Sequence, residues 1–229
     1  MLGRFVSAIG IEMPQDFPIK PYENVLKRLV DENDRHPTSF WSEFASAWNA
    51  IAYRFRSCAE HDGAFTESIG RAGNSPPSPE RYVQERELFC FFVTGMSTIE
   101  SFCYSLFAIG SMLDAQTFPL ETAEGKRDVT PKMTIDKFGT AFPCEIITSI
   151  LKRLNDSQEY WDWRTMRNIL SHRSTPSRQF FRGGGHDGNA VWGGILIDEN
   201  TTVSRRRWLA NNLSDLLEAT DTFTVGKFF

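Results

Sequence analysis

The feature that most constrains the fold is a long, almost uncharged stretch in the middle of the chain. Between Glu87 and Asp114 the only charged residue is Glu100, and this length exceeds the minimum for a membrane-spanning helix. Apolar side chains recur along it at helical spacing and cover nearly the whole circumference: Leu88, Phe89, Phe91, Phe92, Met96, Ile99, Phe102, Cys103, Leu106, Ile109 and Leu113. A helix that is apolar on almost every side is buried by other helices or by lipid.

Two properties favour burial by other helices. The stretch carries hydroxyl residues beside its carboxylate, which are costly in lipid: Thr94, Ser97, Thr98, Ser101, Ser105 and Ser111. The residues from Met1 to Gly10 are followed by Glu12 and Asp16 without a convincing cleavage site, so we assign no secretory signal. We expect a soluble, cytoplasmic protein with no membrane partner. A membrane-associated helical protein built around residues 88–113 is the weaker alternative.

The cysteines and the net charge narrow the class further. Cys58, Cys90, Cys103 and Cys144 are far apart and form no CxxC pair that could hold zinc, and three of them lie inside apolar runs. We interpret them as free thiols in a reducing compartment and predict no metal and no cofactor. The formal net charge of −4 argues against a protein that coats nucleic acid nonspecifically, although a local basic patch is compatible with it.

Helical periodicity extends over most of the remaining chain. Ser78, Pro79 and Glu80 provide a cap, a first-turn proline and a dipole-matched charge for the apolar helix, which runs to about Leu113. Other helices are expected at residues 21–32, 38–60, 131–139, 143–154, 157–172 and 204–222, with an exposed connection over 62–79, a loop over 116–129 and a β-hairpin at about 180–203. The sequence therefore predicts an all-α, up-and-down helical bundle with a small β-hairpin insertion before the C-terminal helix.

This length suits one domain. We expect residues 1–229 to form a single domain, in which residues 1–77 are an N-terminal helical extension that packs on a bundle of residues 78–229.

The candidate for chemistry is the segment Arg167-Asn168-Ile169-Leu170-Ser171-His172, at the end of a predicted helix. Its arginine-to-histidine spacing is weak evidence alone, because 18 arginines and four histidines give about one such pair by chance. Arg56 and His61 have the same spacing. The pair therefore needs support from its surroundings.

Three observations favour Arg167 and His172 over the other pair. Asn168 lies one helical turn before His172, so its amide could orient the imidazole. His172 lies in the last turn of its helix, where the dipole favours the imidazolium. The segment from Trp163 to Arg182 contains no acidic residue and five arginines: Arg164, Arg167, Arg173, Arg178 and Arg182. This composition predicts a phosphate-attracting patch.

The segment 167–172, late in an all-helical chain, resembles the HEPN domains, named for nucleotide-binding proteins of higher eukaryotes and prokaryotes. It matches the family pattern of arginine, a polar residue, three more residues and histidine, and the resemblance covers roughly residues 80–222. Many members of that family are metal-independent endoribonucleases that act as homodimers, with both motifs lining one cleft, and others only bind. Standalone toxins in such families often pair with an antitoxin, which makes an antitoxin or regulatory protein a further possible partner.

The resemblance implies a role for each site residue. His172 would exchange protons with the ribose 2′-hydroxyl or the leaving 5′-oxygen, while Arg167 would hold the phosphate during in-line attack. Asn168 would orient His172, and Ser171 could add a hydrogen bond to phosphate. The neighbouring arginines Arg164, Arg173 and Arg178 would bind RNA. A homodimer would solve the geometry, because Arg167 and His172 are separated by about 140° around an ideal helix.

Alternatives remain open at three places. Glu100 is costly inside an apolar helix unless it is paired, so it either lies at a solvent-facing edge with Ser97, Ser101 and Tyr104 or contacts Arg167 or His172 in the site. Arg167 and His172 could themselves be a surface pair without chemistry. The glycine-rich run from Gly183 to Gly188 lacks the lysine and hydroxyl of a phosphate loop, and we interpret it as a hairpin tip.

Overall fold

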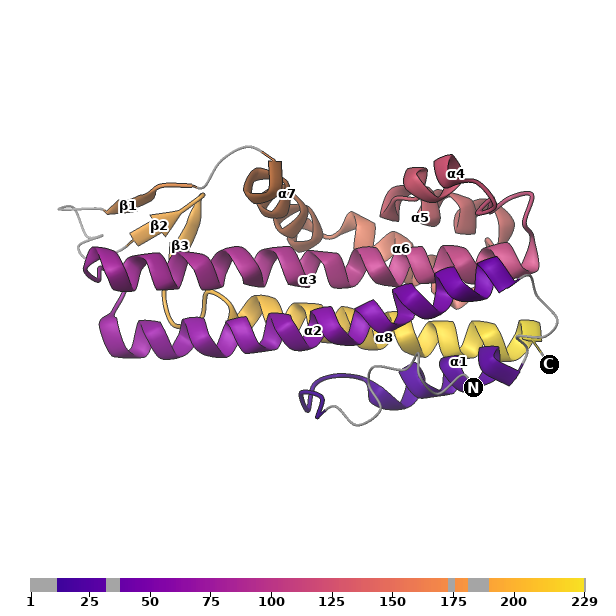
Figure 1. Cartoon of the computed structure of the whole chain (residues 1–229), viewed down its shortest axis with the longest axis horizontal. Coiled ribbons are helices and arrows are strands. Elements are labelled where there is room, and N and C mark those ends of the chain that lie inside the picture. The colour runs from indigo at the N-terminus through magenta and orange to yellow at the C-terminus, as the bar shows by residue number, and fades with distance from the viewer. Residues whose placement is uncertain (1–11, 32–37, 173–175, 181–189, 229) are drawn as a thin grey trace. The chain divides into compact units, whose positions relative to one another are not determined.

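The computed structural model describes residues 12–31, 38–172, 176–180 and 190–228, which form eight helices and one small sheet (Figure 1). The helices are α1 (Ile19–Asp31), α2 (Thr38–Ala72), α3 (Ser78–Leu113), α4 (Ala123–Asp128), α5 (Pro131–Ala141), α6 (Ile146–Asp156), α7 (Gln158–His172) and α8 (Val203–Phe228). The strands are β1 (Arg178–Phe180), β2 (Ala190–Trp192) and β3 (Ile195–Ile197). The prediction of an all-α bundle with a small hairpin before the last helix is confirmed.

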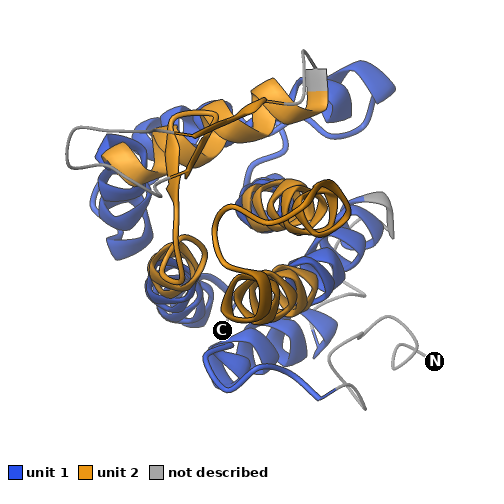
Figure 2. Cartoon of the chain, turned by 90° about the vertical axis from the view of Figure 1, so that its left-hand side faces the viewer, with its two compact units in different colours: residues 1–54, 97–157, 210–229 blue, residues 55–96, 158–209 orange. Residues whose placement is uncertain are grey.

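The chain folds into two compact units, and neither is continuous in sequence (Figure 2). Unit 1 comprises Met1–Arg54, Ser97–Ser157 and Ala210–Phe229, and unit 2 comprises Phe55–Met96 and Gln158–Leu209. The long helices α2, α3 and α8 therefore contribute residues to both units. The single domain and its division at residue 77 stay predictions.

Helix α2 is longer than its sequence suggested. The predicted end near Glu60 and the predicted exposed connection over 62–79 are wrong, because the helix continues to Ala72. Its buried face continues through Cys58, Phe65 and Ile69 at helical spacing. Gly63 and Gly70, which suggested a loop, lie on the exposed side of the helix with no other group near them. The predicted loop over 116–129 likewise contains the short helix α4, which Thr122 caps by accepting a hydrogen bond from the amide of Gly125 at 3.0 Å.

Helix α3 is the apolar stretch from which the prediction began. It is long and apolar enough to cross a membrane, but 72% of its most apolar 18-residue window is buried inside the protein. Such burial is expected of the core helix of a soluble protein.

Aromatic side chains form the core of unit 1. Tyr22 on α1 stacks on Trp48 of α2 at 5.2 Å between ring centroids, and each ring donates a hydrogen bond of 3.2 Å to the other residue's carbonyl oxygen. Phe118 and Phe138 meet edge to face at 5.3 Å, and Phe223 of α8 lies 5.6 Å from Phe138. The first pair of residues holds α1 to α2, and the second group holds α5 to α8.

Unit 2 contains α7 and the sheet. Trp163 of α7 is fully buried and lies 4.9 Å from Phe91 and 5.2 Å from Phe92, both on α3. The ring also lies directly on the backbone of Gly95, where a Cβ atom would be only 2.2 Å from it. A glycine on α3 is therefore what allows α7 to pack so closely.

The sheet is antiparallel with strand order β1-β2-β3. Its tight turn joins β2 to β3 at Gly193 and Gly194, whose φ angles of 58° and 86° are favourable only for glycine. The predicted hairpin tip at Gly183–Gly188 lies outside the described residues. The observed turn between β2 and β3 was not predicted from the sequence.

Candidate functional site

The predicted site lies on the last two turns of α7. Trp163, Met166 and Leu170 form the buried face of this helix, as their spacing predicted. Asn168 is partly exposed and Ser171 is exposed. His172 is the last residue of the helix, but its side chain and the whole of Arg173 lie outside the described residues. The backbone thus brings Arg167, Asn168, Ser171 and His172 to one helix end, as their sequence spacing requires.

The two arginines of α7 have different surroundings. Arg167 is partly buried, and this burial lowers the pKa of its guanidinium. The guanidinium of Arg164 lies over the ring of Trp161, 4.9 Å from its centroid, in a cation–π contact. Trp161 is 39% exposed, so this pair lies on the surface of unit 2.

Arg178, the third described arginine of the predicted patch, is an interior residue of unit 2. Its side chain is only 1% exposed, and burial lowers its pKa. One nitrogen donates hydrogen bonds to Gln84 Oε1 at 2.7 Å and to the carbonyl oxygen of Asn74 at 3.3 Å, and Nε lies 3.4 Å from the carboxylate of Glu85. These contacts tie β1 to the start of α3. We therefore leave Arg178 out of the RNA contacts proposed below.

The competing pair on α2 has partners of its own. Arg56 forms an ion pair with Glu60 at 2.8 Å, one turn along the helix. His61 Nδ1 lies 2.6 Å from Glu87 Oε2, and Glu87 also pairs with Arg86. Burial raises the pKa of Glu87, but its hydrogen bonds with His61 and Arg86 outweigh burial and leave that pKa lowered. Arg56 and His61 therefore both have carboxylate partners within unit 2, and these ion pairs give the two residues a structural role.

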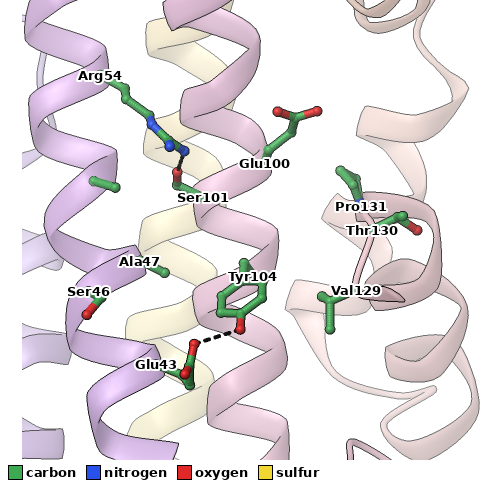
Figure 3. A pocket seen from close by; sticks show the side chains of 11 residues that line it. Glu43, Ser46, Ala47, Arg54, Glu100, Ser101, Tyr104, Val129, Thr130 and Pro131 are labelled. Atoms are coloured by element: carbon green, nitrogen blue, oxygen red, sulfur yellow. Dashed lines mark hydrogen bonds between the residues drawn. The ribbon is translucent and has the colours of Figure 1, made fainter. Parts of the chain in front are cut away.

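Glu100 lies in unit 1, on the wall of a cavity of about 470 Å³ (Figure 3). It is partly exposed and shares this wall with Ser101 and Tyr104, two of the three residues that the sequence placed beside it. Because Arg167 belongs to unit 2, the proposed contact between Glu100 and the site stays a prediction.

The cavity itself was missed by sequence reasoning. Its charged lining residues are Glu43 and Arg54 on α2 and Glu100 on α3. A signal was present: Glu43, Ala47, Ala50 and Arg54 recur at helical spacing, so a charged residue stands at each end of a face whose middle is small. The apolar residues of the same helix predict only its buried face: Phe44, Trp48, Ile51 and Phe55.

No family model, curated protein or solved structure matches this chain. Among the described residues, no three His, Cys, Asp or Glu side chains gather in a way that could hold a metal ion.

Proposed function

We propose that the chain is an RNA-binding protein with a metal-independent endoribonuclease site at the C-terminal end of α7, completed by a second copy of the chain. The observation that supports it most is the composition and exposure of that helix end. A buried face of Trp163, Met166 and Leu170 anchors α7, while Asn168 and Ser171 reach solvent beside a partly buried Arg167. A cytoplasmic location belongs to the same proposal.

Electrostatics supports the choice of this helix end. The acidic residues of α7, Glu159 and Asp162, lie in its first half, and none follows Trp163 on the helix. A cationic side chain near a helix C-terminus is favoured by the dipole, and an RNA phosphate at Arg167 would meet no carboxylate from the last two turns of the helix, whereas Asp162 shares a turn with Arg164. The other arginine and histidine at this spacing, Arg56 and His61, are already paired with Glu60 and Glu87.

The reaction would be transesterification of RNA. The ribose 2′-oxygen attacks the adjacent phosphorus and gives up its proton, the bond from phosphorus to the 5′-oxygen breaks, and that oxygen takes a proton. The products are a 2′,3′-cyclic phosphate and a 5′-hydroxyl. His172 would move the protons, oriented by Asn168, and Arg167 would stabilise the charge that gathers on the phosphate oxygens. Across a twofold axis, Arg167 of one copy would act with His172 of the other, which would bring the two side chains to one phosphate.

The experiment is an RNA cleavage assay on purified protein in the presence of a chelator, with mass spectrometry of the product ends. His172→Ala should lower the rate by about 10²–10⁴-fold, the usual contribution of a general acid or base. Arg167→Ala should lower it by about 10²–10³-fold. Arg167→Lys keeps the charge but loses the planar fork, so it should recover only part of the rate. The matched control is Arg56→Ala, which alters the other arginine of the same spacing and should retain the rate.

Mixing the two inactive variants tests the shared cleft. A heterodimer of His172→Ala with Arg167→Ala carries one intact arginine and one intact histidine on different chains. Recovery of activity on mixing supports a composite site. If mixed dimers form but remain inactive, each motif acts within its own chain and the site is not shared.

The chief alternative is a noncatalytic module that uses the same surface to bind RNA, nucleotides or a protein. It predicts no cleavage by the wild-type protein but RNA binding that weakens in Arg167→Ala and falls with salt concentration. Absence of both cleavage and binding would refute the proposal in either form.

A further inference from the structure

The cavity in unit 1 lies between α2, α3 and the segment that joins α4 to α5 (Figure 3). Its volume of about 470 Å³ falls within the range typical of small-molecule sites. All of its lining residues belong to unit 1, so its shape is determined within one compact unit.

The sequence of α2 explains why there is space here. Glu43, Ala47, Ala50 and Arg54 lie on one face of the helix, and the two alanines leave the middle of that face hollow. Arg54 lies eleven positions after Glu43, which corresponds to about 16 Å along the helix axis. The cavity is therefore elongated, with a cation at one end and a carboxylate at the other.

The Arg54 end has an uncompensated positive charge. One guanidinium nitrogen donates hydrogen bonds to the carbonyl oxygen of Ser97 at 3.1 Å and to Ser101 Oγ. These are neutral acceptors, and no carboxylate of the described residues pairs with Arg54. Arg54 is exposed as a residue, and burial of part of its side chain lowers the pKa of the guanidinium. A planar guanidinium held in this way suits a carboxylate, which it can bind through two parallel hydrogen bonds.

The Glu43 end is already neutralised. Lys126 Nζ lies 2.6 Å from one carboxylate oxygen, and the Tyr104 hydroxyl donates to the other at 2.7 Å. Burial raises the pKa of Glu43, but these two bonds outweigh burial and leave it lowered, so the group stays ionised. Burial raises the pKa of Tyr104, and the Glu43 carboxylate raises it further, which keeps the hydroxyl protonated. A second anion would therefore find no available cation among the described residues at this end, because Lys126 already pairs with Glu43.

We propose that this cavity binds a small organic monocarboxylate, whose carboxylate pairs with Arg54 and whose apolar body lies along Ala47 and Ala50 against Val129 and Pro131. Arg54 is the one cation among the described lining residues, so the second negative charge of a dicarboxylate or of a phosphate dianion finds no partner in the cavity. This site does not depend on the ribonuclease proposal.

Isothermal titration calorimetry with four six-carbon probes tests the chemistry: hexanoate, adipate, hexyl phosphate and hexylamine. Hexanoate should bind best, since it alone combines one negative charge with an apolar body. Arg54→Gln should weaken hexanoate binding by about 10–100-fold, the usual cost of losing hydrogen bonds to a charged group. Ala50→Leu should abolish binding by filling the cavity without changing a charge. Arg127→Gln alters an arginine of α4 that is 77% exposed, and it should leave the affinity unchanged.

Several results would overturn the proposal. They are the absence of hexanoate binding to the wild-type protein, equal binding of hexylamine, tighter binding of hexyl phosphate, and unchanged affinity in Arg54→Gln. If Arg54→Gln fails to fold by circular dichroism, the probe series and Ala50→Leu still decide the question, because neither removes the charge.

Discussion

Replacing Gly95 by alanine should disturb the helix that carries the predicted site. A Cβ at this position would lie 2.2 and 2.3 Å from two carbon atoms of the Trp163 ring. Because carbon atoms in contact prefer about 3.5–4.0 Å, the ring would have to retreat by about 1.3 Å. Phe91 and Phe92, at 4.9 and 5.2 Å between centroids, stand against the ring and restrict that movement. Overpacking of this kind costs about 1–3 kcal/mol.

Alanine has a higher helix propensity than glycine, and this difference offsets about 1 kcal/mol of the cost. The clash involves a rigid, fully buried ring instead of the end of a flexible chain, so we expect a cost at or above the top of that range. The expected net loss is therefore about 2 kcal/mol, which for a chain of this size lowers Tm by about 4–8 °C. Urea unfolding followed by circular dichroism measures this difference, and near-UV circular dichroism reports the displaced tryptophan.

The control is Gly63→Ala on α2, where no other group lies within 4 Å of the added methyl. This change should stabilise the protein by about 0.5–1 kcal/mol. In a Trp163→Leu background the added methyl at Gly95 has room, so the two substitutions should be strongly nonadditive. A Gly95→Ala protein as stable as the wild type, or strict additivity with Trp163→Leu, would refute the packing argument.

Two further predictions concern buried charges of unit 2. Arg206→Met should cost about 3 kcal/mol in urea unfolding, because Asp62 is buried and lies 3.1 Å from this arginine; the exposed Arg207→Met should cost under about 0.5 kcal/mol, and equal effects would contradict the role of the pair. Glu87→Gln should destabilise the protein at pH 7. Since the folded pKa of Glu87 is lowered, its contribution is present above the unfolded pKa of about 4.3 and is lost as pH falls through the folded value. The gap between wild type and Glu87→Gln should close in acid, unlike that for the exposed Glu60→Gln, and a gap that persists would exclude the carboxylate as its cause.

The helices that the sequence predicted well are those with strong local signals. The start of α3 at Ser78 agrees with the predicted signal of a serine, a first-turn proline and an acidic residue, although the Ser78 hydroxyl accepts from the Arg81 side chain at 3.3 Å, and the end of α3 at Leu113 coincides with the loss of apolar periodicity. The end of α2 was missed because glycine lowers helix propensity locally, whereas burial of Phe65 and Ile69 stabilises the helix from outside the segment. Tertiary packing of this kind has no local signature.

The candidate site was predictable only as a position on a helix. Spacing places Arg167, Asn168 and His172 on α7, and amphipathicity gives its buried face. Spacing could not reveal that Arg178 is buried against Gln84 and Glu85, because those partners lie far away in sequence on another helix. The arginines of this cluster therefore differ in their environments, and the differences depend on contacts with residues that are distant in sequence.

Each of the two sites proposed for this chain depends on small residues in a helix. Gly95 removes a side chain from α3, and the Trp163 ring fills that space, which anchors α7 and the helix end with Arg167. Ala47 and Ala50 also remove bulk from a helix face, but among the described residues no ring fills the space between Arg54 and Glu43. This cavity is open to solvent, because Ser46, Arg54 and Thr130 of its lining are exposed. It can therefore admit a ligand at the charge of Arg54, whereas the filled space at Gly95 has a structural role, and the two positions should respond differently to added bulk. Bulk at Gly95 destabilises the fold, whereas bulk at Ala50 should leave the fold intact and remove only the ligand.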